Sequence, residues 1–478
     1  VYMDEFVNFI ENKYGTAGSP SGVKGYSLDN EPGLWSHTHP RIHPDKTGCA
    51  EFVERTIACA KAVKAVDPDA DILGFVSYGF NALNSLQGAP DWDTYKAAYK
   101  YYINYYLDEL KKASDAHGNR LIDILDTHWY PEARGGGKRI TADAGGTSAE
   151  CDWARVQAPR SFWDPTYLEN SWISQWFGGC FPLLSWLKSS VDTYYPGTDL
   201  GCTEYNFGAT DHITGGIAVA DILGVFGKFG VKLATYWKLS GNQTYSSAGF
   251  RIYRNYDGAG STYGNTKVKA DTSDIENSSI YAAIDGTDDS ILHIIAINKN
   301  FTKDLPFNFT IGGTRAYTSA LVWGFDSSSP AITRRPDVSS ISGNNFSYTL
   351  PVKSVYHFVL SGSGTIVTPV PTSAPTAAPT IEPTAIPTLP PTTAPTSVST
   401  PIPTAEPTTA PGMLGDVNGS GTIDIVDALL VAQYYVGLGP AGFDPSVADV
   451  NCSGAIDIVD ALLVAQYYVG LITGFTGC

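Results

Sequence analysis

The chain has 478 residues, with 31 Lys and Arg against 48 Asp and Glu, and a formal net charge of −17. At about 100–200 residues per domain this length predicts several folded units, and a hydrophobic content of 43% excludes a chain that is disordered throughout. The acidic balance argues against a nucleic-acid-binding protein, because phosphate contacts need clustered Lys and Arg. No uncharged apolar run reaches the roughly 18 residues that a membrane span requires.

The N-terminal residues predict an amphipathic helix, in which Phe6, Ile10 and Tyr14 recur every four residues. They contain neither a basic region nor an apolar stretch, so they do not predict a signal peptide. A chain that opens inside a helix, without an initiator Met, is expected to be a fragment or a processed product.

Residues 1–250 alternate short apolar runs with longer helical patterns, which indicates an α/β fold with a parallel sheet covered by helices. The predicted strands are residues 25–30, 71–77, 122–129, 200–205 and 231–239. The clearest predicted helices are residues 50–66, 94–117 and 216–230. Since a (β/α)8 barrel needs eight strands, a barrel here lacks its first three, and we expect this part of the chain to fold poorly by itself.

Residues 251–362 consist of short β-rich runs separated by Gly, Asp, Ser and Asn. Within them Phe346, Tyr348 and Leu350 alternate with polar residues, a period of two that predicts an antiparallel β-sandwich. The predicted strands are residues 290–298, 305–311, 318–325, 346–350 and 355–360. Residues 363–413 are rich in Pro and Thr and predict an extended, semi-stiff linker.

Residues 414–478 contain a repeat with an offset of 33, in which residues 416–427 match residues 449–460. Both copies have oxygen-bearing residues at positions 1, 3, 5, 9 and 12 of a calcium loop, Gly at position 6 and a backbone carbonyl ligand at position 7. The alternative is a pair of Asx turns that bind nothing. The predicted ligands of two calcium ions are Asp416, Asn418, Ser420, Thr422, Asp424 and Asp427, and Asp449, Asn451, Ser453, Ala455, Asp457 and Asp460.

Each loop is followed by one helical segment and preceded by none, and this arrangement resembles the type I dockerins of cellulosomal enzymes. The resemblance implies a cohesin partner on a scaffoldin and an extracellular location. The positions that set cohesin specificity in the family hold Ile425-Val426 and Ile458-Val459, which suggests an apolar contact. Cys452 and Cys478 either join the second loop to the C-terminus or remain free.

Two carboxylates follow β-like runs in the first 250 residues: Glu31 in Asn-Glu-Pro, and Glu204 in Thr-Glu-Tyr-Asn. Active sites of barrels lie at the C-terminal ends of the strands, and glycoside hydrolysis needs two carboxylates that flank the scissile bond. The alternative is that either Glu is a solvated loop residue.

Residues 27–44, 126–132, 169–176 and 203–208 closely resemble glycoside hydrolase family 44, in order along residues 1–360. Members are retaining endo-β-1,4-glucanases and xyloglucanases with a (β/α)8 barrel and a β-sandwich. The resemblance implies that Glu31 is the general acid/base after the fourth strand and that Glu204 is the nucleophile after the seventh. It also implies that three strands precede Val1.

Several other side chains gain expected roles from this resemblance. Asn30 is expected to bind the sugar 2-hydroxyl, and His128 and Tyr130 to orient Glu204, although a barrel-rim His is often only structural. The predicted sugar-stacking residues are Trp172, Trp176 and Trp237. Glu31 should hold its proton near neutral pH, and the two carboxyl groups should lie about 5–5.5 Å apart.

Three histidines, His37, His39 and His43, have a spacing that would suit a metal, but a structural role suffices for them.

The leading hypothesis is a secreted, cellulosome-borne endo-β-1,4-glucanase that acts on cellulose-type glucans or xyloglucan and needs no cofactor for the chemistry. One alternative is a non-catalytic, cohesin-anchored glucan-binding module, because the barrel is partial. Another is a calcium-dependent adhesion protein, which would not account for residues 1–250.

Overall fold

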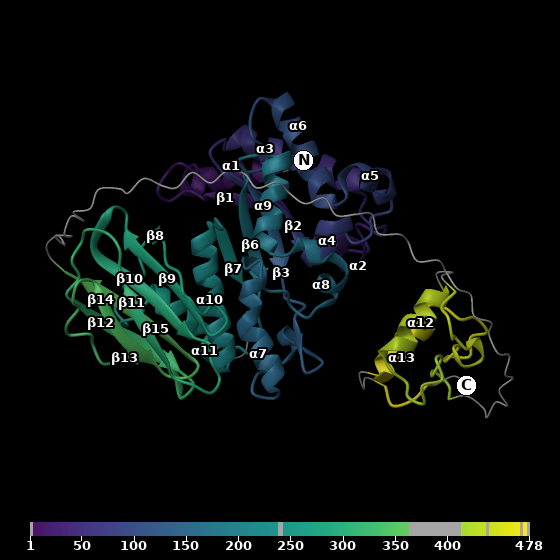
Figure 1. Cartoon of the computed structure of the whole chain (residues 1–478). Coiled ribbons are helices and arrows are strands. Elements are labelled where there is room, and N and C mark those ends of the chain that lie inside the picture. The colour runs from purple at the N-terminus through teal and green to yellow at the C-terminus, as the bar shows by residue number, and fades with distance from the viewer. Residues whose placement is uncertain (1–2, 238–241, 363–412, 436–438, 469–471, 476–478) are drawn as a thin grey trace, which may run out of the picture. The chain divides into compact units, whose positions relative to one another are not determined.

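A computed structural model describes residues 3–237, 242–362, 413–435, 439–468 and 472–475 (Figure 1). The chain divides into two compact units, Val1–Ser373 and Ala374–Cys478. Each unit is described by itself. In the described residues, no helix is both long enough and apolar enough to cross a membrane.

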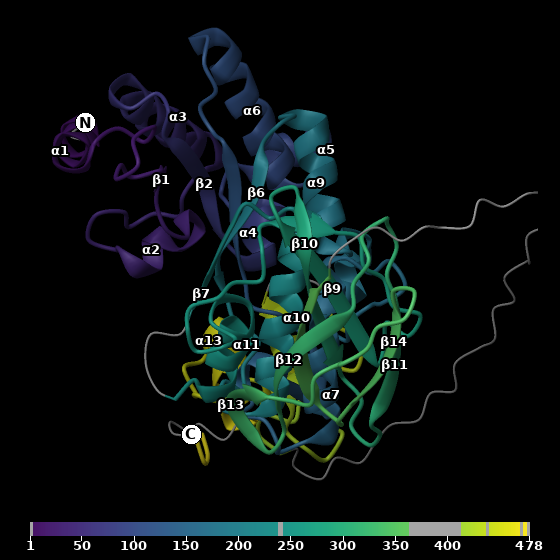
Figure 2. The same ribbon diagram turned by 90° about the vertical axis from the view of Figure 1, so that its left-hand side faces the viewer.

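The first unit begins with a parallel sheet whose strand order is β1-β2-β3-β6-β7. All neighbouring strands in it are parallel, and Figure 2 shows the sheet curled, with helices beside it. This confirms the five predicted strands and the α/β class. The strands are β1 (Gly25–Ser27), β2 (Asp71–Tyr78), β3 (Ile124–Trp129), β6 (Asp199–Tyr205) and β7 (Leu233–Tyr236).

The helices of this part include the three that were predicted, with shifted ends. They are α1 (Met3–Tyr14), α2 (Trp35–Thr38), α3 (Cys49–Val66), α4 (Gly79–Ser85), α5 (Trp92–Tyr99), α6 (Tyr102–His117), α7 (Ala149–Gln157), α8 (Trp172–Phe177), α9 (Leu183–Tyr194), α10 (Ile213–Phe229) and α11 (Thr244–Arg254). A small hairpin, β4 (Arg134–Gly135) and β5 (Lys138–Arg139), follows β3.

Two details of the predicted helices are wrong. The single helix predicted over residues 94–117 is two helices, because Lys100 has φ 64° and ends α5 in a conformation that a helix cannot continue. In α1 the buried residue is Val7, whereas Phe6 is 52% exposed. Helix α1 packs against α3. The side of α1 that is buried contains Val7 and is shifted by one residue from the predicted side, which contains Phe6.

The second half of this unit is antiparallel and confirms the expected β-sheets. A six-stranded sheet has the order β13-β12-β15-β10-β9-β8, and β11 pairs with β14 alone. The strands β8, β9 and β13 were not predicted. The strands are β8 (Thr266–Val268), β9 (Ser278–Asp285), β10 (Asp288–Asn298), β11 (Leu305–Thr310), β12 (Ser319–Asp326), β13 (Ser329–Arg334), β14 (Asn345–Leu350) and β15 (Ser354–Ser361).

The parallel and antiparallel parts share one apolar core. Tyr281 of β9 lies so close to α10 that a Cβ at Gly224 would meet its ring at 2.2 Å, and the Tyr281 hydroxyl donates a hydrogen bond to Asp221 at 2.6 Å. The same core cluster contains Ile217 of α10 and Val355 of β15. The predicted boundary near residue 250 is therefore not a gap in packing, and the four predicted domain ranges remain a proposal.

A buried histidine pair joins the two parts. The His293 Nδ1 lies 3.0 Å from the His357 Nε2, and the His357 Nδ1 lies 2.9 Å from the carbonyl of Ile252 in α11. His357 is fully buried. Burial, with the neighbouring His293 as a smaller cause, lowers the pKa of His357 to about 3.

The pair predicts that the first unit loses stability in acid. Because the folded-state pKa of His357 lies below the value of about 6.5 in an unfolded chain, the unfolded state binds one more proton between pH 6.5 and 3. The stabilisation is present above pH 6.5 and falls by roughly 1 kcal/mol per pH unit below it. Urea unfolding of His357→Gln between pH 4 and 7 should show a smaller acid slope than the parent chain. Equal slopes would contradict this.

The second unit contains two helices, α12 (Ile425–Tyr435) and α13 (Ile458–Tyr468), which pack against each other. Val431 and Val464, at equivalent positions of the repeat, are fully buried in its two small apolar clusters. A loop precedes each helix, as predicted. The predicted linker, residues 363–413, lies almost wholly outside the described residues.

Candidate active site

Three polar residues meet where strands of the parallel sheet end. His128 on β3 and Glu204 on β6 are paired in register, so their side chains start side by side. Glu31 follows β1, and its backbone N–H donates to the Val76 carbonyl of β2 at 3.0 Å. Glu31 has φ 47°, a left-handed conformation that is rare for a residue with a side chain.

The carboxylates of Glu31 and Glu204 are bridged by one imidazole. The His128 Nδ1 lies 2.7 Å from the Glu31 Oε1 and 3.3 Å from the Glu204 Oε2. One oxygen of each carboxylate and the imidazole nitrogen all lie within 4.8 Å of one another. His128 is buried, and the side chains of Glu31 and Glu204 are each 15% exposed. Two carboxylates this close together can act on the same bond.

Tyr130 completes the cluster from the segment that follows β3. Its hydroxyl donates a hydrogen bond to the Glu204 Oε2 at 2.8 Å. Burial, then the hydrogen bond to Glu204 and its negative charge, raises the pKa of Tyr130. The phenol therefore keeps its proton and acts as a hydrogen-bond donor to the Glu204 carboxylate.

A buried carboxylate that the sequence analysis missed ties β3 to β6 beneath this cluster. Asp126 accepts hydrogen bonds from the Thr203 hydroxyl and from the Thr203 backbone N–H, the latter at 2.9 Å. Burial raises the pKa of Asp126, against the effect of these hydrogen bonds. The alternation Asp126-Thr-His128 was a signal for it, because residues two apart on a strand share a face.

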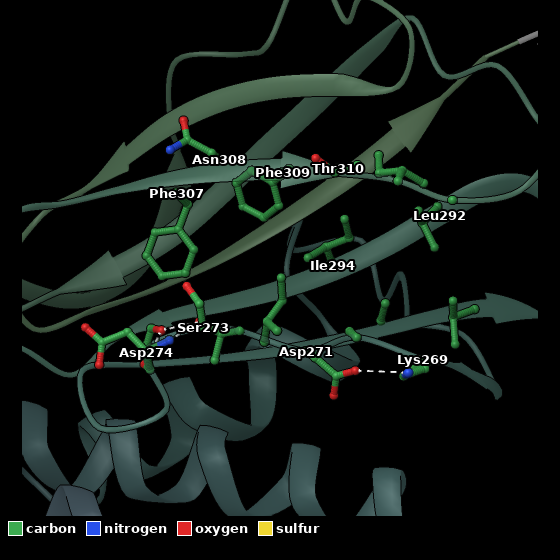
Figure 3. Close-up of a pocket in the computed structure, with 18 of the residues that line it drawn as sticks. Lys269, Asp271, Ser273, Asp274, Leu292, Ile294, Phe307, Asn308, Phe309 and Thr310 are labelled. Atoms are coloured by element: carbon green, nitrogen blue, oxygen red, sulfur yellow. Dashed lines mark hydrogen bonds and ion pairs between the residues drawn. The ribbon is translucent and has the colours of Figure 1, made fainter. Parts of the chain in front are cut away.

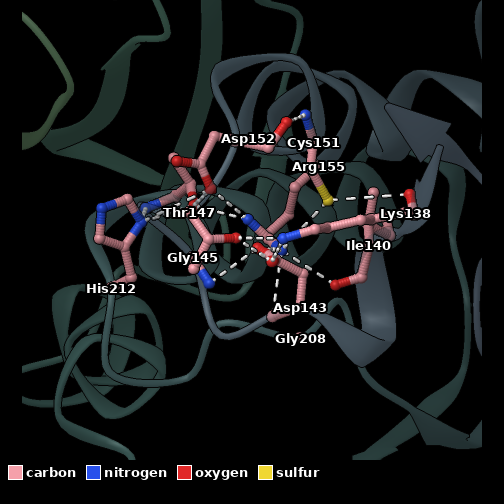
Figure 4. Close-up of polar contacts among 12 residues, drawn as sticks. Lys138, Ile140, Asp143, Gly145, Thr147, Cys151, Asp152, Arg155, Gly208 and His212 are labelled. Carbon is pink, nitrogen blue, oxygen red and sulfur yellow. Dashed lines mark hydrogen bonds and ion pairs between the residues drawn. The ribbon is translucent and has the colours of Figure 1, made fainter. Parts of the chain in front are cut away.

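The segment after Glu204 is fixed by the buried Arg155 of α7 (Figure 4). Its Nε donates to the Phe207 carbonyl at 3.1 Å, and its Nη1 contacts Asp152 at 2.6 Å. Asp143 is a second partner, at 3.1 Å. Although burial opposes it, hydrogen bonds from Thr147 and Gly145 and the charge of Arg155 lower the pKa of Asp143 to about 2. The backbone beyond the site is thus rigidly held.

The predicted sugar-stacking residues fall into different environments. Trp172 is half-buried and its ring packs edge-on against Phe80, with centroids 5.8 Å apart. Trp176, on the same six-residue helix α8, is 78% exposed, and Trp237, directly after β7, is 48% exposed. Asn30 is exposed beside Glu31. Trp176 and Trp237 therefore offer free indole faces, whereas Trp172 is partly used in packing.

The three clustered histidines do not converge on one another. The His43 Nε2 lies 2.9 Å from the Glu51 Oε1, and its ring packs against Trp35 with centroids 5.4 Å apart. His37 and His39 are exposed. In the described part of the chain, the one group of three metal-ligating side chains that lie close together is Glu31, His128 and Glu204.

Two cavities lie in the first compact unit. One of about 450 Å³ adjoins the carboxylate cluster through Tyr130 and Asn206. Another of about 630 Å³ lies between strands of the antiparallel part, where Phe307 and Phe309 point into it from β11 (Figure 3). The linings of both cavities lack Glu31, His128 and Glu204, but the first contains Tyr130, whose hydroxyl contacts Glu204.

The two repeat loops have the same internal geometry. The Asp427 carboxylate accepts hydrogen bonds from the backbone of Asn418 and Asp424, at 3.3 and 2.8 Å, and Asp460 makes the equivalent contacts at 3.3 and 2.9 Å. The Ser420 hydroxyl lies 3.0 Å from the Thr422 carbonyl, so two predicted ligand oxygens converge.

Charge compensation shows that the loops suit a cation. Asp427 and Asp460 are fully buried, and residues 361–478 contain no Lys or Arg. No ion pair reaches either carboxylate within the described residues. Buried carboxylates need a positive partner, and all-oxygen loops with Gly421 and Gly454 at φ 84° and 85° fit calcium.

Cys452 is disulfide-bonded, whereas Cys478 lies outside the described residues.

Comparison with known proteins gives two family matches. The model of glycoside hydrolase family 44 matches residues 1–133, and that of the dockerin type I domain matches residues 414–468. Endoglucanase A of Paenibacillus lautus is 52% identical over 365 residues, which are 76% of this chain and 52% of the relative. The chain thus spans about half the length of that curated relative.

Solved structures of the same family are equally similar. An endoglucanase of glycoside hydrolase family 44 from Clostridium thermocellum is 55% identical, with a TM-score of 0.74. A family 44 xyloglucanase from Paenibacillus polymyxa is 51% identical, with a TM-score of 0.73. In both comparisons the match covers 75% of this chain and 70% of the solved chain.

Proposed function

Because this chain belongs to glycoside hydrolase family 44, we propose that it is a retaining endo-β-1,4-glucanase that hydrolyses cellulose-type glucans or xyloglucan. The observation that carries the proposal is the bridging of Glu31 and Glu204 by His128 at the ends of the parallel strands. Two carboxylates at this spacing suit a double displacement. The structural relatives include an endoglucanase and a xyloglucanase, which supports both substrate classes.

In the proposed mechanism Glu31 is the general acid and Glu204 is the nucleophile. Glu204 attacks the anomeric carbon while Glu31 protonates the departing glycosidic oxygen, which leaves a covalent glycosyl-enzyme. Glu31 then removes a proton from water, and this water displaces Glu204 from the same face that the leaving group left. Two inversions give net retention at the anomeric carbon.

The neighbouring groups serve this exchange of protons. We propose that His128, in contact with both carboxylates, keeps them aligned, and that the Tyr130 hydroxyl holds Glu204 ionised and aimed. Asn30 is exposed beside Glu31, where a sugar hydroxyl would reach it. Trp172, Trp176 and Trp237 are proposed to stack on sugar rings, with Trp176 and Trp237 the more open of the three.

The proposal predicts retention of configuration. When a cello-oligosaccharide or xyloglucan oligosaccharide is hydrolysed in an NMR tube, the β-anomer of the new reducing end should appear first and equilibrate later with the α-anomer. A fall in the viscosity of a soluble glucan ahead of reducing-sugar release would identify endo cleavage. Early α-anomer would contradict the double displacement. Glucan binding without any hydrolysis would instead favour a non-catalytic binding module.

We further propose that residues 414–478 anchor the enzyme to a cohesin of an extracellular cellulosome, with two bound calcium ions. The dockerin match and the paired loops support this. The exposed apolar pairs Ile425-Val426 and Ile458-Val459 suit an apolar cohesin surface. The proposed ranges are 1–250 for the catalytic barrel part, 251–362 for the sandwich, 363–413 for the linker and 414–478 for the dockerin.

A further inference from the structure

Arg139, on strand β5 of the small hairpin after β3, holds three consecutive residues of another segment. Its Nη2 donates to the Tyr130 carbonyl at 2.8 Å, and its Nε donates to the Pro131 carbonyl at 3.0 Å. The same Nη2 lies 2.8 Å from the Glu132 Oε1. A guanidinium is planar and its N–H donors have fixed directions. Its contacts with Tyr130, Pro131 and Glu132 therefore set both the position and the orientation of this segment.

The segment that Arg139 holds lies just beyond the ladder between β3 and β6. Strand β3 ends at Trp129, whose pairing with Tyr205 is the last contact of the ladder with β6. Pro131 has no backbone N–H and cannot extend the ladder. The Tyr130 and Pro131 carbonyls are therefore placed by the guanidinium rather than by the sheet.

The placement of this backbone decides where the Tyr130 hydroxyl lies. That hydroxyl donates to the Glu204 Oε2 at 2.8 Å, and an error of about 1 Å in such a contact is enough to weaken catalysis strongly. We propose that Arg139 is a positioning residue for the hydrolysis, which acts on Glu204 through Tyr130. The inference rests on the proposed role of Glu204 as nucleophile.

The charges around the guanidinium agree with a positioning role. Glu132 pairs with Arg139 directly. Glu169 of the neighbouring segment lies close enough for Arg139 to lower its pKa, although burial raises that pKa overall. The side chains that face Glu204 are His128, Tyr130 and Glu31. Arg139 therefore affects the position of Glu204 only indirectly, through Tyr130.

Loss of the guanidinium has a specific expected signature. In Arg139→Gln the phenol leaves Glu204, the ionised carboxylate loses a donor, and its pKa rises. The acid limb of the pH profile for kcat/KM should therefore move to higher pH. kcat should fall about tenfold, while KM for a soluble glucan changes little, because Arg139 contacts the backbone of Tyr130 and Pro131 and the carboxylate of Glu132.

A double-mutant cycle tests whether the effect passes through Tyr130. Tyr130→Phe should lower kcat about 10–100-fold, the usual value of a hydrogen bond to a charged group. If Arg139 acts through this hydroxyl, adding Arg139→Gln to Tyr130→Phe should cost less than about twofold more. Arg139→Lys should behave like Arg139→Gln, because an ammonium cannot hold two carbonyls and a carboxylate in one plane.

Two matched controls separate positioning from general destabilisation. Arg334→Gln removes a similar forked arginine, which pairs with Asp337 on the sandwich, and should leave activity unchanged. Glu132→Gln keeps both carbonyl contacts of Arg139 and should have a smaller effect than Arg139→Gln. If Arg139→Gln does not fold, Arg139→Lys provides the same comparison.

Titration of 13C-labelled glutamate side chains by NMR reports on Glu204 even without turnover. The proposal requires the Glu204 resonance to titrate at higher pH in Arg139→Gln than in the parent chain. An unchanged Glu204 titration, or fully additive losses in the double variant, would overturn the positioning role. An inactive parent chain with the expected titration shift would count against the proposed function and leave the positioning role supported.

Discussion

Glu204→Gln is expected to lower kcat on a soluble β-1,4-glucan by roughly 10⁴-fold or more, while the fold is retained. The amide has nearly the same shape as the carboxylate but cannot form the covalent glycosyl-enzyme. It can still accept the Tyr130 hydrogen bond through its oxygen, so the cluster should keep its geometry. Initial rates and circular dichroism measured on the same preparation check both halves of this expectation.

Azide separates the roles of the two carboxylates. With an activated aryl glycoside, azide entering the space left in Glu204→Ala should displace the aryl group once and give the α-glycosyl azide. In Glu31→Ala azide should attack the glycosyl-enzyme and give the β-glycosyl azide. The matched control is Glu109→Gln, a change at a half-buried residue of α6 that pairs with Lys112. Equal rates for Glu204→Gln and the parent chain would remove the assignment.

The architecture near the site could be predicted because its signals are local. A strand that ends in Asn-Glu-Pro and a later strand that ends in Thr-Glu-Tyr place two carboxylates at the same edge of a parallel sheet. His128 was named as a neighbour of Glu204 on the strength of the family resemblance, and β3 and β6 pair in register at these two residues. The contact between His128 and Glu31 could not be predicted. Strand β2 lies between the strands that precede these two residues, so the contact depends on the curl of the sheet and on the left-handed backbone of Glu31.

Residues whose roles depend on tertiary contacts could not be predicted from the sequence. Arg139 and Arg155 lie in segments without strong periodicity, and their partners are backbone carbonyls of other segments. Strand β9 was missed because residues on both of its faces are buried, Tyr281 in one apolar cluster and Ala282 in another, so it lacks the alternation that marks a half-exposed strand. The face of α1 was misjudged because Val7 is smaller than Phe6 and gives a weaker signal.

The repeat loops show the opposite case, in which sequence and structure give the same expectation. Each loop has its position-12 carboxylate, Asp427 or Asp460, turned inward and fully buried. The backbone N–H groups that bind these carboxylates offset part of the charge, but no Lys or Arg follows residue 360. A divalent cation is the compensation that the chain itself does not supply.

Removal of calcium is therefore expected to unfold residues 414–478 and to abolish cohesin binding. With calcium at about 1,000 times its Kd, each ion contributes about 4 kcal/mol to folding, so chelation should weaken cohesin binding by roughly 1,000-fold or more. The double variant Asp427→Asn, Asp460→Asn should match the chelated protein even in excess calcium, because each loop loses its inward-facing carboxylate and no longer holds its ion. Binding measured on the full chain by calorimetry, with and without a chelator, checks this.

Hydrolysis of a soluble glucan is the internal control in that experiment, because Glu31, His128 and Glu204 belong to the other compact unit. Chelation should leave its rate unchanged while cohesin binding is lost, and restored calcium should restore binding. The single variants should each keep binding if either repeat suffices, since α12 and α13 have the same sequence and expose the same apolar residues. Full cohesin binding in the chelated protein would show that the loops fold as Asx turns alone, without a bound cation.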